Sequence, residues 1–472
     1  MKPIRPARST SRTRELSCLT ALLAVLLLSR PAVGQAVPQP STIVLNHVAI
    51  VDVAESALRS DMAIVVRDQR IVQVLPASAL EVPDGSEVLD LPGKFVIPGL
   101  IDMHNHLGSG ENIPGPPVRP VAERDPRESL AQLLALGFTT VFATAYASVT
   151  EFAELRRALL PATASGARLL GTTRSSTVPG GHSSQARFNA YMPTTTDQAR
   201  ANVRETAAVG VDAIKIIYSD QAHTGGPPVP VMSREIMTAI IEEAHLQGLK
   251  AYVHAPTLDH AKEALRAGAD GLAHSVADAP VDDEFIELMR QNDATYTTTL
   301  ALYTAFAGVA EWMRSLEAID VHGLVSGDVY ARYESEEGAR AYHAFFGTFP
   351  GQNLGIAQGN VRRLVGSGIA VLAGTDTGVT GVLLGLSSQR ELELLVEAGL
   401  TPGEALRAAT SQPASALGLE AEIGSIEEGK LADLVILDAN PLTSISNTRS
   451  VHRVMKGGVV HDPLELLTGS RR

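Results

Sequence analysis

The pattern of hydrophobic and polar positions changes twice along the chain. Residues 41–91 contain short β-like runs, such as STIVLNHVAIVD and MAIVVRDQRIVQVLP, separated by Asp, Gly and Pro turn residues. From Val96 onward, apolar runs of strand length alternate with amphipathic segments of helical length. β-like runs return near the C-terminus, in ADLVILD and VHRVMKGGVVHD. The sequence therefore predicts a long βα region between two β-rich segments.

The alternating region contains eight candidate strands. One intervening helix, predicted over residues 233–247, has Ser233 at its N-cap and Gly248 just beyond its end. Eight strands that alternate with helices predict an α/β fold of the (β/α)₈, TIM-barrel type. The candidate strands are residues 95–104, 139–144, 168–172, 213–217, 250–254, 271–274, 294–299 and 369–376.

The two β-rich segments, 41–94 and 420–465, are predicted to pair into one small β-sandwich domain beside the barrel of residues 95–419. Two separate small domains are the alternative. Residues 300–368 are too many for a simple connection between the seventh and eighth strands. Their pattern is mostly helical, which predicts an insertion or lid over the mouth of the barrel.

Residues 1–34 have the organisation of a secretory signal peptide. Basic residues precede the apolar run 16–28, and the small residues Ala32, Val33 and Gly34 follow it. An uncleaved anchor is the alternative, but this run of 13 residues is short beside the roughly 20 that a membrane span needs. We therefore expect a periplasmic or secreted protein with no stable membrane anchor after cleavage.

Charge and cysteine content narrow the functional classes. Residues 1–34 carry six basic residues and one acidic residue, so removing their net charge of +5 changes the charge of the chain from −13 to −18. Such an acidic protein repels nucleic acid. We expect a small-molecule substrate and no nucleic-acid partner, and a homo-oligomer is possible. The single cysteine, Cys18, would leave with the signal peptide. The mature chain would then have no disulfide and no cysteine nucleophile.

Several potential metal ligands stand where apolar runs end. His104 and His106 close VIPGLIDMHNHL, and residues i and i+2 of a strand point to the same face. His254, His274 and Asp376 close three later runs. A single histidine of this kind would ordinarily be a packed core or loop residue. Because the active sites of (β/α)₈ barrels lie at the C-terminal ends of the strands, the recurrence predicts a metal site there.

Lys215 lies inside the apolar strand DAIKIIY, where an ammonium group would be costly to bury. A snorkelling lysine or a buried ion pair is one interpretation. The functional interpretation is a carbamylated lysine, in which the neutral amine has reacted with CO₂ to give a carboxylate that bridges two divalent ions. The nearby histidines favour zinc as the ion.

The ordered set VIPGLIDMHNHL, DAIKIIY, AYVHA, DGLAHS and AGTDTG, with GKLADLVILD near the C-terminus, resembles the amidohydrolase superfamily, in particular its binuclear, carbamyl-lysine branch. Within the superfamily, the chain is most similar to the imidazolonepropionase-like and prolidase-like amidohydrolases. The resemblance covers essentially the whole mature chain.

The resemblance implies a role for each of these residues. It implies two divalent ions, bound by His104, His106 and Asp376 at the first site and by His254 and His274 at the second, with carbamylated Lys215 bridging them. A hydroxide shared by the ions would attack the scissile carbonyl, and Asp376 would take its proton and deliver it to the leaving group.

Three further residues are weaker candidates. His182, in VPGGHSS after the third strand, is a candidate for catalytic contact with the carbonyl and for substrate binding, since similar family members carry Gly-Gly-His there. Tyr218 and His223 are candidates for substrate binding. Strand alternation turns Tyr218 away from the face of Lys215 unless the strand has already ended. Ordinary loop roles are the alternative for all three.

These features predict an exported hydrolase of amide-type C–N bonds, acting on a dipeptide, an N-acyl amino acid or a cyclic amide. The same chemistry would suit a lactone, carbamate or phosphotriester. A site with one ion, without carbamylation of Lys215, is a further option. A non-catalytic binding protein on the same fold is the alternative from another class, and loss of a metal ligand would favour it.

Overall fold

A computed structural model describes residues 41–107, 125–161, 163–185, 189–222, 227–346 and 353–469, without the side chains of residues 345 and 346. The predicted signal peptide, residues 1–34, lies outside these ranges. Within them, every helix is too short or too polar to cross a membrane. The prediction that the protein is exported is therefore not tested by the structure.

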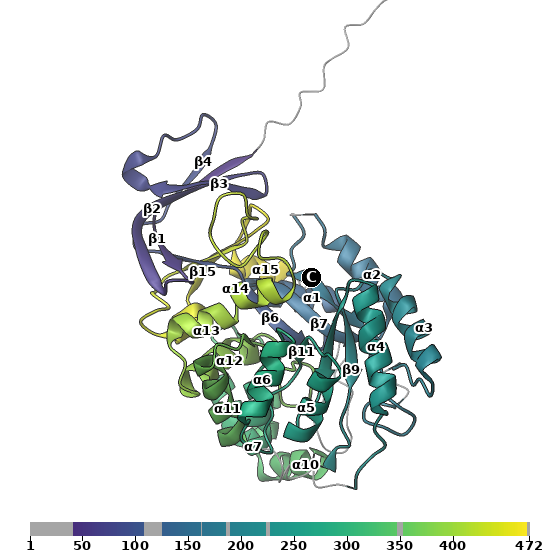
Figure 1. Cartoon of the computed structure of the whole chain (residues 1–472). Helices are drawn as coiled ribbons and strands as arrows, with labels where there is room; N and C mark the ends of the chain where they lie inside the picture. The colour runs from purple at the N-terminus through teal and green to yellow at the C-terminus, as the bar shows by residue number, and fades with distance from the viewer. Residues whose placement is uncertain are drawn as a thin grey trace, which may run out of the picture. The chain divides into compact units, whose positions relative to one another are not determined.

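The two β-rich segments share one eight-stranded sheet (Figure 1). Strand β14, from the C-terminal segment, pairs antiparallel with β5, which in turn pairs in parallel with β1 from the N-terminal segment. A hydrophobic cluster on this sheet joins Leu45 and Ile64 to Leu434 and Met455. The paired strands, in order, are β16 (Val459–His461), β15 (Val451–Lys456), β14 (Leu434–Leu437), β5 (Phe95–Pro98), β1 (Thr42–Asp52), β2 (Ala57–Arg67) and β3 (Arg70–Pro76), with β4 (Glu87–Asp90) also paired to β1.

The first predicted barrel strand, residues 95–104, is two strands that belong to two sheets. β5 belongs to the terminal sheet, whereas β6 (Leu100–Asn105) begins the barrel. The amide of Gly99 donates to the carbonyl of Asp433 beside β14, and the next amide, of Leu100, donates to the carbonyl of Gly137 beside β7 (Phe138–Tyr146). A Cβ on Gly99 would lie 2.0 Å from the Thr139 hydroxyl, so only glycine fits where the chain changes sheets. The prediction of one continuous strand was wrong because this close approach is a tertiary contact.

The other barrel strands follow the predicted order. They form a three-stranded and a five-stranded parallel sheet. Parallel bridges between Asn105 and Thr377 and between Ser176 and Ile216 join the two sheets on both sides, so the barrel closes. The strands are β6, β7 (Phe138–Tyr146) and β8 (Arg168–Thr173), then β9 (Ala213–Ile217), β10 (Lys250–His254), β11 (Gly271–Leu272), β12 (Thr295–Thr297) and β13 (Val371–Leu372).

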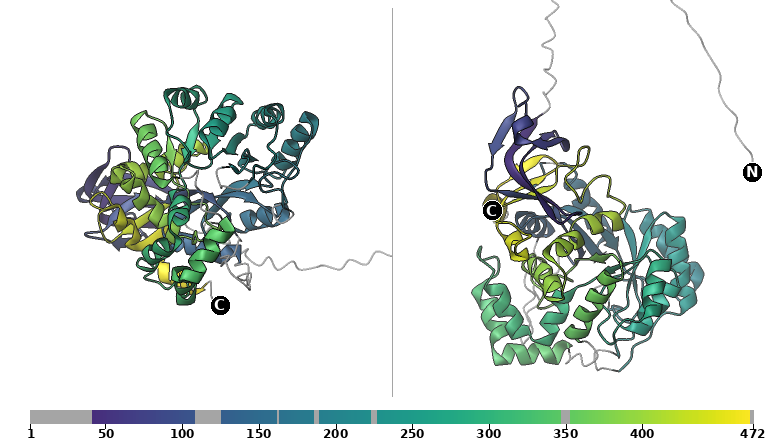
Figure 2. Two further views of the ribbon diagram at one scale, coloured as in Figure 1. Left: turned by 90° about the horizontal axis from the view of Figure 1, so that it is seen from below. Right: turned by 60° about the vertical axis from the view of Figure 1, so that its left-hand side comes forward.

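Helices surround these strands (Figure 2). Ser233 caps α4 as predicted, since its side chain accepts a hydrogen bond from the amide of Ile236. The helices outside the insertion are α1 (Pro126–Ala135), α2 (Val149–Ala158), α3 (Thr196–Ala207), α4 (Arg234–Leu246), α5 (Leu258–Arg266), α6 (Asp283–Gln291), α11 (Leu354–Gly366), α12 (Leu386–Glu397), α13 (Pro402–Ala408), α14 (Ser411–Ala416) and α15 (Pro463–Gly469), and the 3₁₀ turns are η1 (Ala77–Ala79) and η4 (Ile445–Arg449).

The long connection after β12 is mostly helical where the structure describes it, with turns at residues 318–326. It packs on the loop that follows β13: the indole N–H of Trp312 donates to the carbonyl of Gly381 (2.8 Å), and Tyr342 also lies against Gly381. Figures 1 and 2 show these green helices at the end of the barrel away from the terminal sheet. Of the predicted insertion 300–368, we use the name insertion below for the helices before α11: α7 (Leu300–Ala307), α8 (Val309–Glu317), α9 (Gly327–Glu334) and α10 (Glu336–Phe346).

Candidate metal centre and active site

The first histidine pair lies at the C-terminal end of β6. The Nε2 atoms of His104 and His106 both lie 3.0 Å from Oδ1 of Asp376, so the two side chains converge on one point as their i, i+2 spacing predicts. His104 is buried, whereas His106 keeps a third of its side chain exposed. One ligand of the pair is therefore enclosed by the barrel, and the other lies at its opening.

Backbone pairing brings Asp376 to these histidines. The amide of Asp376 donates to the carbonyl of His104 (2.9 Å), and the amide of His106 donates to Thr377 (2.7 Å). Asp376 has left the regular strand, with a φ of +65°. This left-handed conformation is uncommon for a residue with a side chain, and aspartate tolerates it better than most residues do. The carboxylate position thus depends on a local backbone turn that the barrel holds in place.

The later histidines complete the cluster. The imidazole rings of His104 and His274 lie 4.5 Å apart, and those of His254 and His274 are also 4.5 Å apart. Ligand atoms of His104, His274 and Asp376 all lie within 4.8 Å of one another, close enough to hold one metal ion. Nδ1 of His274 lies 3.1 Å from the hydroxyl of Thr299. His254 and His274 thus extend the first group of ligands across the end of the barrel.

Lys215 lies within β9 and is only 2% exposed. Its Nζ atom and Nε2 of His254 have no hydrogen-bond partner among the described residues. Burial lowers the pKa of Lys215 to about 7, although the charge of Asp376 opposes this change. Buried polar atoms without partners are costly unless another group satisfies them. A divalent ion, with a carbamate on Lys215, fits this set of donors.

The protonation states also suit metal ligands. Burial lowers the pKa of His104 to about 4, and burial together with neighbouring cationic groups lowers the pKa values of His254 and His274 well below the ordinary range. Burial alone would raise the pKa of Asp376, but the surrounding histidines outweigh it and hold this pKa well below its usual value. Neutral imidazoles and an ionised carboxylate are the forms that bind metal.

The structure places the three remaining candidates, His182, Tyr218 and His223, differently. The ring of His182 lies 4.7 Å from that of His254, so the structure brings it to the cluster. Tyr218 follows the end of β9 and packs against His260 of α5, with ring centroids 5.2 Å apart. His223 lies outside the described residues. The catalytic and substrate-binding roles of these three residues remain predictions.

The sequence analysis did not identify the residues that hydrogen-bond to the backbone of a ligand or to one another beside the ligands. Oδ1 of Asp102 accepts from the amide of His104, and its Oδ2 accepts from the hydroxyls of Thr375 and Ser388. Asp102 stands two residues before His104, on the same face of the strand, and this spacing could have identified it. Ser388 belongs to a helix that follows Asp376, and no short-range pattern connects it with the site.

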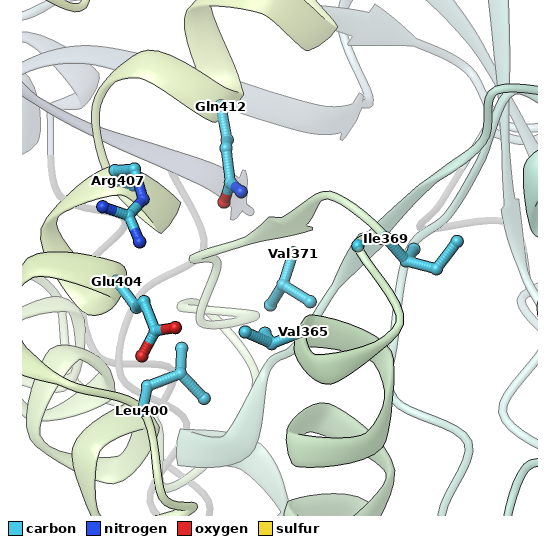
Figure 3. Close-up of a pocket in the computed structure, with 8 residues that line it drawn as sticks. Val365, Ile369, Val371, Leu400, Glu404, Arg407 and Gln412 are labelled. Atoms are coloured by element: carbon cyan, nitrogen blue, oxygen red, sulfur yellow. The ribbon is translucent and has the colours of Figure 1, made fainter. Parts of the chain in front are cut away.

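A pocket of about 160 Å³ lies at the N-terminal end of β13, whereas the candidate metal ligands lie beyond its C-terminal end (Figure 3). Val371, the first residue of β13, lines it, whereas the candidate metal ligand Asp376 follows the other end of that strand. Its two charged lining residues already have partners, because Glu404 caps α13 and Arg407 binds backbone carbonyls at Val53 and Ala54. This pocket is therefore distinct from the metal-ligand cluster.

Comparisons with known proteins agree with this architecture. An imidazolonepropionase from Streptomyces griseus is 29% identical over 415 residues, which cover 86% of this chain and 92% of that protein. A crystal structure of a provisionally named prolidase from Bifidobacterium longum has a TM-score of 0.69 and 29% identity, covering 92% of this chain and 99% of the other. An ochratoxinase from Aspergillus niger is 27% identical over 269 residues, or 56% of this chain, and the match spans about half of that relative (48%).

The family model for amidohydrolases matches residues 95–460. This range includes β5, the whole barrel and the C-terminal strands of the terminal sheet, and it contains every candidate metal ligand named above. The metal-dependent chemistry of that family agrees with the cluster of His104, His274 and Asp376. The chain therefore belongs to the amidohydrolase family of hydrolytic enzymes.

Proposed function

We propose that this protein is an exported, binuclear metal-dependent hydrolase of amide-type C–N bonds, with a dipeptide, an N-acyl amino acid or a cyclic amide as substrate. Family membership and relatives named imidazolonepropionase, prolidase and ochratoxinase support cleavage of C–N bonds. One ion would be held by His104, His106 and Asp376. The other ion would be held by His254 and His274, and the carbamate on Lys215 would bind both ions. The most direct support is the pair of buried nitrogen atoms, Nζ of Lys215 and Nε2 of His254, that have no hydrogen-bond partner among the described residues, beside an ionised Asp376.

The bound ions would lower the pKa of a bound water and polarise the scissile carbonyl. The residues of the chain would orient the reaction and move its proton. Asp376 is anionic and held 3.0 Å from two imidazole nitrogens, so its carboxylate is fixed where it can take the proton of the attacking water and pass it to the leaving nitrogen. His182, near His254, would contact the substrate carbonyl.

Lys215 would be modified before it acts. With a pKa near 7 its amine is substantially neutral at physiological pH. The lone pair of the neutral amine can then form an N–C bond to CO₂ while one amine proton leaves to solvent, which converts a buried neutral amine into a carbamate anion. Zinc is the proposed metal because imidazole and carboxylate ligands suit it.

Hydrolysis of a panel of compounds by purified, metal-loaded protein tests this proposal. The panel contains dipeptides, N-acyl amino acids, cyclic amides, lactones and aryl esters, and the chelator-treated protein is the control. We expect turnover of an amide-type compound that chelation abolishes and added metal restores. Exclusive turnover of lactones or esters would overturn the C–N assignment, and equal turnover after complete metal removal would overturn the metal-dependent one.

Export is tested separately by fractionation of cells that express the full chain. We expect the protein in the periplasm or the medium, with an N-terminus near Gln35. Retention of residues 1–34 on protein in the cytoplasm would overturn this part of the proposal without affecting the reaction.

A further inference from the structure

Thr299 departs from the usual behaviour of the residue that begins a helix. It is the N-cap of α7, yet its φ is +48° and its side chain makes no capping hydrogen bond. An N-cap threonine normally adopts an extended conformation and accepts from an amide of the first turn. A left-handed conformation is costly for a β-branched residue. The hydroxyl of Thr299 instead lies 3.1 Å from Nδ1 of His274.

A carboxyl group from another helix caps α7 instead. Glu391 of α12 is completely buried. Its Oε1 accepts from the amide of Leu300 (2.9 Å) and its Oε2 from that of Ala301 (2.7 Å). The hydroxyl of Thr298 also donates to Oε1. Three donors around the turn are thus satisfied by one side chain that is distant in the sequence, at the end of the helix where a carboxyl group is favourable.

The contact between Thr299 and His274 has a consequence for metal binding. If Nδ1–H of His274 donates to the Thr299 hydroxyl, the ring proton is fixed on Nδ1 and the lone pair of Nε2 remains available to a metal ion. Thr299 can make this contact because Glu391 has taken over the capping of α7. The same face of α12 also carries Ser388, three residues earlier, whose hydroxyl supports Asp102 behind His104.

We propose that Glu391 is a positioning residue of the metal centre: it caps α7 in place of Thr299 and so directs the Thr299 hydroxyl to His274, which keeps His274 in the tautomer that binds metal through Nε2. This inference rests on the proposed function for its metal-binding consequence. The tautomer of His274 can also be measured in the metal-free protein. The two claims can therefore fail independently.

The first experiment measures the affinity for Co²⁺ and Zn²⁺ by competition with a chelator, and the visible spectrum of the cobalt form. We expect Glu391→Gln to weaken binding of one ion about 10- to 100-fold, as loss of groups that orient a ligand typically does. The matched control is Glu243→Gln. Glu243 is another buried helical carboxylate. It lies on α4 and pairs with Arg204 of α3, and its partners among the described residues, Arg204 and Gln247, are not candidate metal ligands.

The second set of variants tests whether Glu391 acts on His274 through the Thr299 hydroxyl. Thr299→Val keeps the β-branched shape and removes the hydroxyl, so it should weaken binding as Glu391→Gln does, while Thr299→Ser should retain affinity. In the double variant with Glu391→Gln, the losses should not add, because both changes break one chain of contacts. Additive losses of metal affinity in the double variant would overturn the proposal. It would also be overturned if Glu243→Gln, at an equal loss of stability, lost as much metal affinity as Glu391→Gln.

The third measurement needs no metal. In metal-free protein with ¹⁵N-labelled histidine, the His274 signals are assigned by comparison with His274→Gln. We expect the Nδ1–H tautomer in the wild type and a mixture of tautomers in Glu391→Gln. An Nε2–H tautomer in the wild type would overturn the role of Glu391. A wild type that binds no divalent ion would overturn the proposed function instead, and the tautomer would still decide this inference.

Discussion

At the scale of single residues, the candidate site depends on side chains in unusual environments. Lys215 is buried without a hydrogen-bond partner among the described residues, and Asp376 stays ionised although it is buried. Asp376 also has a left-handed backbone. Each feature costs free energy in a protein without a metal ion, and each suits a group that binds metal and moves a proton. Folding alone gives no reason for this combination.

Replacing Asp376 by Asn tests its role in proton transfer. Asn has nearly the same shape and tolerates a positive φ, so we expect an unchanged fold. The amide cannot accept the proton of the attacking water, and kcat should fall by several orders of magnitude. Steady-state kinetics on the substrate found by the screen measure this effect, with circular dichroism as the control for folding. Turnover close to that of the wild type would refute the proton-transfer role.

At the scale of elements, the structure shows which connections hold the site together. The insertion α7–α10 packs on the loop after Asp376, α12 contacts both sides of the cluster, and Gly99 marks the change from the terminal sheet to the barrel. Each of these contacts joins segments that are distant in the sequence. Each can be broken by its own substitution, with a predicted effect on stability or activity.

Gly99→Ala tests the change of sheets. The new Cβ would lie 2.0 Å from the Thr139 hydroxyl, so one of the two strands must move. We expect a loss of about 1–3 kcal/mol in the free energy of unfolding, typical of an overpacked core. Denaturant unfolding measures it. Combining the change with Thr139→Gly should recover much of the loss, whereas a double variant no more stable than Gly99→Ala would contradict the steric explanation.

Trp312→Phe tests the contact between the insertion and the loop after Asp376. It removes the donor to Gly381 and leaves that carbonyl buried, which should cost about 1–3 kcal/mol of stability. We also expect lower kcat/KM because the loop after Asp376 loses a fixed contact. Tyr252→Phe is the control, since it removes a similar buried bond, to the carbonyl of Ala416 in α14. Equal activity losses in both variants would argue against a specific role of the insertion.

Glu391 makes the stability depend on pH. Burial raises its pKa from 4.5 to about 7, with the charge of Asp102 adding to the effect and three hydrogen bonds opposing it. The folded protein therefore holds this proton more tightly than the unfolded chain, and the resulting stabilisation is lost as the pH rises from about 4.5 through about 7. We expect the stability difference between wild type and Glu391→Gln to change by about 3 kcal/mol across that range. A difference independent of pH would contradict this assignment.

At the scale of the whole molecule, the order of strands and helices was predictable from the sequence. The contacts between segments that are distant in the sequence were not. Apolar runs ending in His104, His254, His274 and Asp376 identified the barrel strands because strand ends of a barrel share one face. The strand over residues 95–104 was predicted as one element because the approach of Gly99 to Thr139 joins distant segments. Glu391 was missed for the same reason, since a glutamate on an amphipathic helix has no distinctive pattern.

We propose one metal-binding reaction centre on a barrel, beside a sheet that the N-terminal and C-terminal segments share. Its domain limits, 41–94 with 420–465 and 95–419, stay a prediction, as does the oligomeric state. The central claim, a pair of metal ions bridged by Lys215, does not depend on either. It also requires no knowledge of the substrate, so it can be tested first.

The most direct test is the number of metal ions per chain, measured by mass spectrometry of metals on protein reconstituted in the presence of bicarbonate. Lys215→Ala is the test variant. The control is Lys94→Ala, just before β5, where Lys94 pairs with Asp438. We predict about two ions per chain in the wild type and in the control, and one or fewer in Lys215→Ala. A folded, active wild type that contains no metal, or a Lys215→Ala variant that keeps both ions, would contradict it.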